Sequence, residues 1–325
     1  MRYDPAQYLY ASARVRAMEA RLWGKQAFSR FLNASTADEI LDDLLEGTVR
    51  DGLPSDRAEA LTAGRMREAI RAVADSVPDP ALVLFMQYPY DCHNLKVIEK
   101  CRHKGISPDG LLIDLGSVDA KTPLTVSEND YLPLFPVHLR EAVSACREAF
   151  AKTTDPQEID FILDRAVFAD MSEAAAPFPL AREWVAAKAD LQNLLSCLRL
   201  LRMQSAELGR SVLERSALPC GTVSTELLLD CYDGGEEALI ATLSRTPYRD
   251  TFAAHTTLGE AERAADNHLM ALIRRAKAIP FGAEVPVSYL LACEAEIKNL
   301  RILLAGKRAG LDTQVIEARM RDCYA

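Results

Sequence analysis

One short pattern occurs three times in the chain and divides it into near-thirds. Each copy has an acidic residue, an asparagine three positions later and a leucine directly after the asparagine. The copies are Asp91 with Asn94, Asp190 with Asn193, and Glu296 with Asn299. The asparagines are 99 and 106 positions apart in a chain of 325 residues, and such self-similarity indicates a repeated structural unit. We therefore predict three helical repeats within one compact structural unit, at residues 1–110, 111–213 and 214–325.

The residues around the three copies also match. A large apolar residue stands nine positions before each asparagine, namely Phe85, Trp184 and Leu290. Gly105 and Gly310 follow the first and third asparagine by eleven positions, after basic residues. Glycine after a basic last turn is typical of a helix C-terminus. The middle copy lacks this glycine, so its helix is expected to run on towards Gly209.

Helical periodicity dominates the rest of the sequence and predicts an all-α fold, with three pseudo-repeated bundles. Apolar residues recur every three or four positions near the N-terminus, from Tyr8 to Leu22. Thr36 with Glu39 and Thr257 with Glu260 have the spacing of a capping box at a helix start. Residues 81–88 could form a buried strand by composition alone. Because their counterparts in the other copies are rich in alanine, we predict a helix there too.

Asparagine is unfavourable in a helix interior, where it costs about 0.7 kcal/mol relative to alanine. Its presence in all three copies indicates that other groups satisfy its side chain. An acid and an asparagine at positions i and i+3 lie on one face and can bind an adjacent helix end, loop or arginine together. The favoured interpretation is a polar clamp that holds each bundle in register. The alternative is a carboxylate–amide metal or catalytic site, which a protein would not normally need three times.

Charge and hydropathy exclude several classes of function. The formal net charge is −9, whereas nucleic-acid binding and docking on anionic lipid both need a dense basic surface. No apolar stretch reaches the roughly 18 residues of a membrane-spanning helix. The N-terminus lacks the apolar region of a secretory signal, so we expect a cytosolic protein. The 8 cysteines are scattered and without a Cys-x-x-Cys pair, which favours buried, reduced thiols.

The sequence carries none of the familiar catalytic patterns. It has no Gly-Lys-Ser/Thr phosphate loop, Gly-x-Gly-x-x-Gly, Gly-x-Ser-x-Gly or His-Glu-x-x-His. One cluster is worth weighing as a metal site, formed by Cys92, His93, Cys101 and His103. Its spacing does not suit zinc, because adjacent Cys–His pairs point in divergent directions. We expect no catalytic residue, no metal site and no cofactor, although a catalytic cysteine or histidine with distant partners stays possible in principle.

Several segments together resemble a known family. They are residues 8–11 and 13–19 near the N-terminus, the three acid-x-x-Asn-Leu helices, the Thr246-Pro247-Tyr248 turn and residues 296–310. In order and spacing they are similar to the C (AC39) subunits, also called d subunits, of rotary V-type and A-type ATPases. The likeness covers essentially the whole chain.

The resemblance implies a mechanical role. Members of the family are funnel-like bodies of three helical bundles that serve as non-catalytic adaptors of the central rotor. They join the D- and F-type shaft subunits to the proteolipid ring in the membrane, and so couple ion transport to ATP hydrolysis or synthesis. The resemblance thus implies a peripheral protein on the cytoplasmic face, with no transmembrane segment and no nucleic-acid partner. Two other hypotheses stay open, an all-helical interaction scaffold from another system and an unrecognised helical enzyme.

Overall fold

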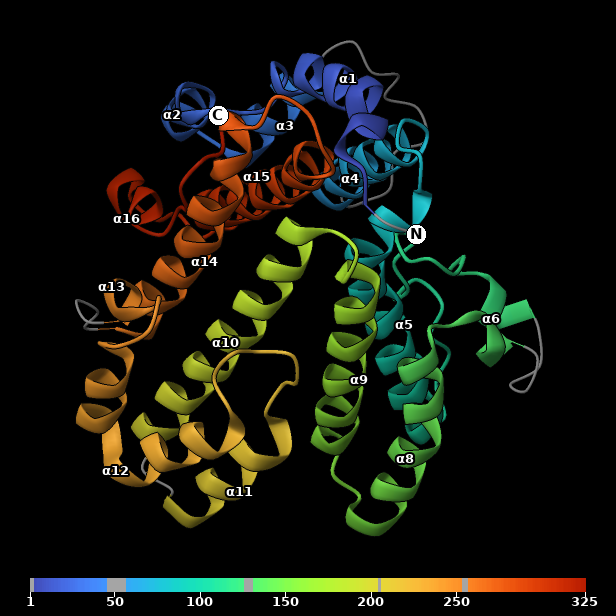
Figure 1. Ribbon diagram of the computed structural model, residues 1–325, viewed down its shortest axis with the longest axis vertical. Coiled ribbons are helices and arrows are strands. Elements are labelled where there is room, and N and C mark those ends of the chain that lie inside the picture. Colours follow the sequence, from blue (N-terminus) through green and yellow to red (C-terminus); the bar gives the residue numbers. More distant parts are fainter. Residues whose placement is uncertain (1–2, 46–56, 126–130, 204–205, 253–256) are drawn as a thin grey trace. The chain divides into compact units, whose positions relative to one another are not determined.

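The computed structural model consists of helices and connecting loops (Figure 1). It describes residues 3–45, 57–125, 131–203, 206–252 and 257–325. Within these ranges every regular element is an α-helix or a 3-10 helix, which confirms the predicted all-α class. The chain divides into two compact units, of which unit 1 combines Met1–Pro80 with His255–Ala325 and unit 2 is Ala81–Ala254.

Unit 1 is built from both ends of the sequence. Its α-helices are α1 (Leu9–Glu19), α2 (Lys25–Asn33), α3 (Ala37–Leu44), α4 (Arg57–Ala74), α14 (Leu258–Arg274), α15 (Glu284–Arg308) and α16 (Thr313–Glu317). Two 3-10 helices adjoin them, η1 (Pro5–Tyr8) and η4 (Arg275–Ala278).

Unit 2 is continuous in sequence. A 3-10 helix, η2 (Pro80–Val83), leads into it, and a second, η3 (Leu132–Leu134), precedes α8. Its α-helices are α5 (Leu84–Lys104), α6 (Thr122–Thr125), α8 (Val137–Thr153), α9 (Gln157–Ala175), α10 (Pro179–Arg202), α11 (Ala206–Ser216), α12 (Thr225–Leu243) and α13 (Arg249–Phe252).

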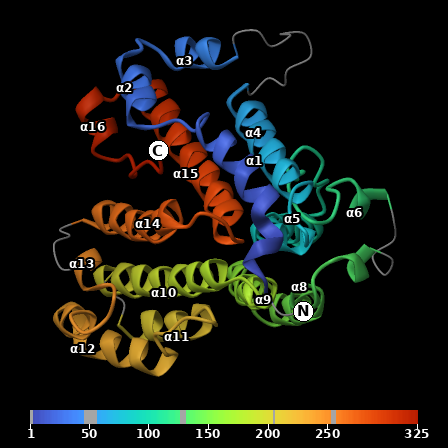
Figure 2. The same cartoon turned by 45° about the horizontal axis from the view of Figure 1, so that its top comes forward.

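The helix α15 is the centre of unit 1 and packs against α1, α3, α4, α14 and α16 (Figure 2). The core around its C-terminal half contains three of its own leucines and apolar residues of α2, α3 and α16. These residues are Leu300, Leu303, Leu304, Phe28, Phe31, Leu32, Ile40, Leu41 and Ile316. Because the core draws on helices near both termini, the two ends of the sequence stabilise each other.

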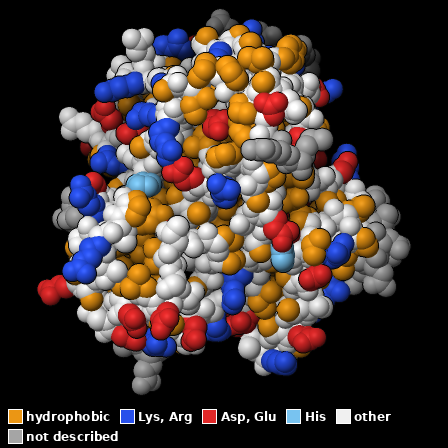
Figure 3. Space-filling model, in the orientation of Figure 1, with side chains coloured by type: hydrophobic (Ala, Val, Ile, Leu, Met, Phe, Trp, Pro, Cys, Tyr) orange, Lys and Arg blue, Asp and Glu red, His pale blue; other side chains and the backbone are white. Residues whose placement is uncertain are grey.

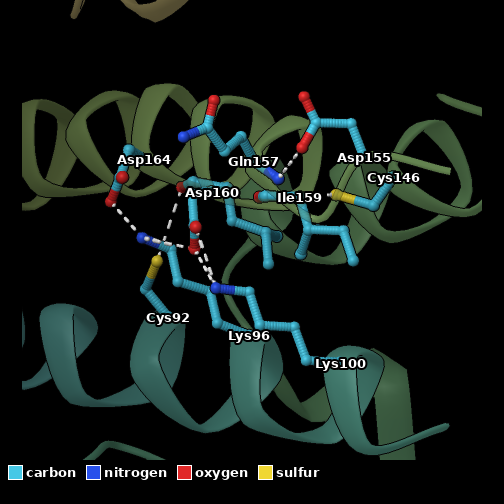
Figure 4. Close-up of polar contacts among 10 residues, drawn as sticks. Cys92, Lys96, Lys100, Cys146, Asp155, Gln157, Ile159, Asp160 and Asp164 are labelled. Carbon is cyan, nitrogen blue, oxygen red and sulfur yellow. Dashed lines mark hydrogen bonds and ion pairs between the residues drawn. The ribbon is translucent and has the colours of Figure 1, made fainter. Parts of the chain in front are cut away.

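In unit 2, α9 packs against α5, α8 and α10. Lys96 and Lys100 of α5 point toward α9, where Lys96 Nζ lies 2.7 Å from Asp164 Oδ1 and Lys100 Nζ lies 2.6 Å from Asp160 Oδ1 (Figure 4). The thiol of Cys92 donates to the backbone oxygen of Leu163, 3.5 Å away. Both lysines and both aspartates are spaced by four positions, so the ion pairs fix the register of the two helices.

The structure tests the helix boundaries expected from the sequence. Residues 81–88 are helical, first as η2 and then as the first turn of α5, as predicted. Gly105 and Gly310 have φ angles of 64° and 65°, the left-handed conformation expected just past a helix end. In both copies the residue after the glycine also donates back into the helix, Ile106 to Cys101 O and Leu311 to Gly306 O.

The prediction for the middle copy is wrong. The helix α10 does not run on towards Gly209 but ends at Arg202. The backbone N–H of Met203 closes it by bonding to the carbonyl oxygens of Arg199 and Leu200, so a glycine is not needed there. Gly209 lies inside the separate helix α11.

Candidate functional site

The three acid–asparagine pairs lie in the middle of the three longest helices of the described ranges, α5, α10 and α15. All six side chains are buried, with between 0% and 4% of their surface exposed. Buried polar groups at this depth need hydrogen-bond partners, because the cost of leaving them unpaired is large. For the three asparagines and for Asp91 and Asp190, the structure supplies those partners from loops that follow the helices.

Each asparagine binds the backbone of a single loop residue through two hydrogen bonds. The Nδ2 atoms of Asn94, Asn193 and Asn299 donate to carbonyl oxygens 2.9, 3.0 and 3.0 Å away. The same loop residues donate their N–H groups back to the asparagine Oδ1 atoms, at 2.8 Å in all three copies. The loop residues are Ile113, Leu218 and Arg321. The asparagine thereby satisfies both backbone polar groups of one half-buried loop residue.

In the first two copies the acid binds the same loop, at the residues four and five positions after the one that the asparagine binds. Asp91 accepts from the N–H and hydroxyl of Ser117 and from the N–H of Val118, at 3.1, 2.5 and 3.2 Å. Asp190 accepts from the N–H and hydroxyl of Thr222 and from the N–H of Val223, at 3.0, 2.6 and 2.9 Å. We call each acid and asparagine, with the loop that they bind, a clamp.

A glycine in each of these two loops lets the backbone approach the acid. A Cβ atom added to Gly116 would lie 2.1 Å from Asp91 Oδ1, and one added to Gly221 would lie 2.2 Å from Asp190 Oδ1. Both distances are far below van der Waals contact. The glycines are therefore part of the clamps, and any larger residue would push the acid away from the loop N–H groups.

The third clamp has the same asparagine geometry but a different acid environment. Glu296 Oε2 accepts from Arg65 of α4 at 2.7 Å, and the backbone amide of Trp23 also faces the carboxylate. Burial raises the pKa of Glu296 from 4.5 to about 7, although Arg65 and the Trp23 amide partly offset that effect. Burial likewise raises the pKa of Asp91, against the hydrogen bonds from Ser117 and Val118.

The turn at Thr246-Pro247-Tyr248 contributes to the second clamp. The hydroxyl of Tyr248 donates to Asp190 Oδ2 at 2.7 Å, and its ring is buried. Burial and the adjacent Asp190 carboxylate raise the pKa of this hydroxyl. Asp190 thus has four donors within hydrogen-bond distance, and the clamp ties a second loop to α10.

The geometry is suited to holding a segment of the chain in place. The acids in the first two clamps are occupied by backbone and hydroxyl donors, and the asparagines by peptide groups. No group of histidine, cysteine, aspartate and glutamate side chains in the described part of the chain could hold a metal ion. Cys92 and Cys101, from the cluster considered above, are buried in the helix packing.

Sequence reasoning located the three helical pairs but not the loops that they bind. Two of these loops share a sequence pattern, an aliphatic residue followed three, four and five positions later by glycine, serine or threonine, and valine, but the pattern is not specific because residues 44–49 also have it. It occurs at Ile113-Asp114-Leu115-Gly116-Ser117-Val118 and at Leu218-Pro219-Cys220-Gly221-Thr222-Val223. The third loop lacks the pattern, because Tyr324 stands at the glycine position.

The contribution of a clamp asparagine to the stability of the fold can be measured with Asn193→Leu. The substitution leaves the half-buried N–H and C=O groups of Leu218 without their asparagine partner, at a cost of about 1–3 kcal/mol per group. Since 1 kcal/mol shifts Tm by about 2–4 °C in a domain of 150–250 residues, we expect Tm to fall by several degrees in a calorimetric scan. The matched control is Gln192→Leu, the exposed neighbour on the same helix, which should leave Tm nearly unchanged. An equal Tm for both variants would contradict the clamp.

The close approach of acid and loop can be tested with Gly116→Ala and Gly221→Ala. Each added methyl group overlaps the clamp acid, and overpacking of this kind costs about 1–3 kcal/mol. Both variants should therefore unfold at lower urea concentration than the parent chain. Gly64→Ala is the control, because its methyl group would meet nothing within 4 Å and alanine favours a helix. If the two loop variants were as stable as that control, the glycines would have no steric role.

Comparison with known proteins places these features in a family. The family model described as ATP synthase (C/AC39) subunit matches residues 11–319. The chain is 25% identical over 323 residues to the C subunit of the V-type sodium ATPase of Enterococcus hirae, covering 95% of this chain and 97% of that protein. It is 23% identical over 325 residues to the C subunit of the A-type ATP synthase of Thermococcus gammatolerans, covering 93% and 86%.

A third relative extends the likeness to another organism. The C subunit of the A-type ATP synthase of Halobacterium salinarum is 23% identical over 351 residues, with 97% of this chain and 98% of that protein covered. The family model and the relatives thus each span nearly the whole chain, and the resemblance expected from the sequence is confirmed. The chain belongs to the family of the C (AC39) subunits of V-type and A-type ATP synthases.

Proposed function

We propose that this protein is a non-catalytic adaptor in the central rotor of a V/A-type ATPase. In this role it joins the D- and F-type shaft subunits to the proteolipid ring and transmits torque between ion flow and nucleotide chemistry. The observation that carries the proposal is the family match over residues 11–319. Relatives matched along most of their length are the C subunits of a V-type sodium ATPase and of an A-type ATP synthase.

The clamps support a mechanical role. A part that transmits torque has to resist deformation, and loops are ordinarily the most mobile segments of a helical protein. Here three loop segments are fixed to the longest described helices by paired hydrogen bonds at buried positions. The clamps therefore stiffen the segments that would otherwise deform most easily under load.

The surface is consistent with protein partners rather than nucleic acid. Acidic and basic side chains are intermixed with apolar ones on the face drawn in Figure 3. A nucleic-acid interface would instead need a continuous basic surface. Exposed large apolar residues also occur in both units, among them Tyr10, Leu134 and Met203. Such residues can take part in protein interfaces.

The proposal includes the threefold organisation and a peripheral location. The repeats at 1–110, 111–213 and 214–325 each contain one acid–asparagine helix. Among the described residues, none of the helices has the length and apolar character needed to cross a bilayer. Our proposal puts the protein at the cytoplasmic side of the membrane, attached through the other components of the complex.

Copurification tests the adaptor role directly. The tagged chain is expressed with the complete set of rotary ATPase subunits from its own source, and membranes are extracted in mild detergent that preserves ATP hydrolysis. We expect the D- and F-type subunits and the proteolipid to elute together with the chain. The matched control uses the same preparation with an untagged chain.

Two outcomes would contradict the proposal. If the ATPase complex stays intact but its subunits do not copurify with the tagged chain, the rotor assignment is wrong. Stable capture of an unrelated assembly, with no rotor subunits, would instead support the hypothesis of a general interaction scaffold. In either case the purified chain alone should hydrolyse no ATP, since the proposal gives it no catalytic group.

A further inference from the structure

The third clamp contains a buried ion pair that joins three parts of unit 1. Arg65 of α4 donates to Glu296 Oε2 of α15 at 2.7 Å. The guanidinium carbon of Arg65 also lies 3.9 Å from the centre of the Trp23 ring, in the turn between α1 and α2. The same guanidinium donates to the backbone oxygen of Arg21 at 3.3 Å. The position of Arg65 thus links α4 and the turn at residues 21–24 to α15.

This ion pair is incompletely satisfied. Glu296 is 3% exposed, and its Oε1 atom has no hydrogen-bond partner in the structure. The Nε atom of Arg65 is likewise buried without a partner. Asp91 and Asp190, at the same position of their clamps, instead accept bonds on both carboxylate oxygens. A buried carboxylate with so few donors gains little from being ionised.

We propose that Glu296 is a proton-operated switch within unit 1. In its ionised state it holds Arg65 against Trp23 and so fixes the turn at residues 21–24 to α15. When Glu296 takes up a proton, the ion pair is lost, and Arg65 turns to the solvent that already reaches a quarter of its side chain. The turn at residues 21–24 then loses its link through Arg65 to Glu296, while Arg301 of α15 still binds Glu59 and Thr62 of α4.

The titration of Glu296 falls in the physiological range. Burial raises its pKa from 4.5 to about 7, so the native protein exchanges this proton near neutral pH. In the unfolded chain the carboxyl titrates near its ordinary pKa. Between pH 4.5 and 7 the native state therefore binds more proton than the unfolded state, and stability from this group falls as pH rises through that window.

The other titratable and charged groups around Glu296 come from α15, α4, α2, α14 and the segment after α16. They are Tyr289, Cys293, Arg65, Glu68, Lys25, Arg274, Asp322 and Cys323. Burial raises the pKa of Tyr289, Cys293 and Cys323, so these hydroxyl and thiol groups stay neutral at pH 7. These three groups therefore do not contribute to the switch.

Tryptophan fluorescence provides a local readout of the switch. The chain has 2 tryptophans, so the full chain carrying Trp184→Phe reports on Trp23 alone. We expect its emission to titrate with a midpoint at a pH of about 7, because the cation leaves the ring as Glu296 is protonated. Adding Glu296→Gln should abolish the titration and hold the low-pH emission at every pH. Adding His268→Asn, which removes a histidine of α14, should leave the midpoint in place.

Hydrogen exchange in the unmodified chain gives an independent measurement. After correction for intrinsic rates, amides at residues 21–24 should exchange several-fold faster about one pH unit below the Glu296 midpoint than one unit above it. In the Glu296→Gln chain they should exchange at the fast rate under both conditions. A pH-independent rate in the parent, or a Trp23 titration that persists in Glu296→Gln, would overturn the proposal. The test involves no other rotor component, so its result is separate from that of the copurification.

Discussion

The two hydrogen bonds between a helix asparagine and one loop residue are the constraint on which the rest of this structure depends. They occur three times, with N–H to Oδ1 distances of 2.8 Å each. In each pair the buried side-chain amide of the asparagine and the half-buried backbone of the loop residue satisfy each other's hydrogen bonds. The small helix penalty of asparagine is thereby offset, and the loop gains a fixed register on the helix. The helices α5, α10 and α15, which carry these residues, each pack against several neighbouring helices.

The three clamps differ in what the acid binds. Asp91 and Asp190 sit against glycines and accept backbone N–H groups, so their loops are bound at several successive positions. Glu296, with a longer side chain, binds Arg65 instead, which comes from 231 positions away in the sequence. The first two clamps therefore organise continuous segments of unit 2, whereas the third joins the two separate stretches of unit 1. Such internal stiffness fits the adaptor role proposed for this member of the AC39 family.

The helical part of the structure and the positions of the clamp residues could be predicted from the sequence, since helix periodicity and i, i+3 spacing are local signals. The left-handed Gly105 and Gly310 followed from the same logic. The loop partners could not, because they lie 19, 25 and 22 residues beyond their asparagines and share no fixed spacing. The end of α10 could not be predicted from the lack of a glycine, because the N–H of Met203 bonds to carbonyl oxygens of the helix itself. The roles of Tyr248 and Arg65 depend on tertiary contacts that no local pattern encodes.

The most direct test of the central claim is residue-resolved amide hydrogen exchange at Ile113, Leu218 and Arg321. These N–H groups belong to loop segments, and loop amides ordinarily exchange fast. If the asparagines bind them as described, all three should be protected by several orders of magnitude, and each should lose protection when its own asparagine, and not another, is replaced. Exchange at the rate of exposed loop amides in the parent chain would contradict the account.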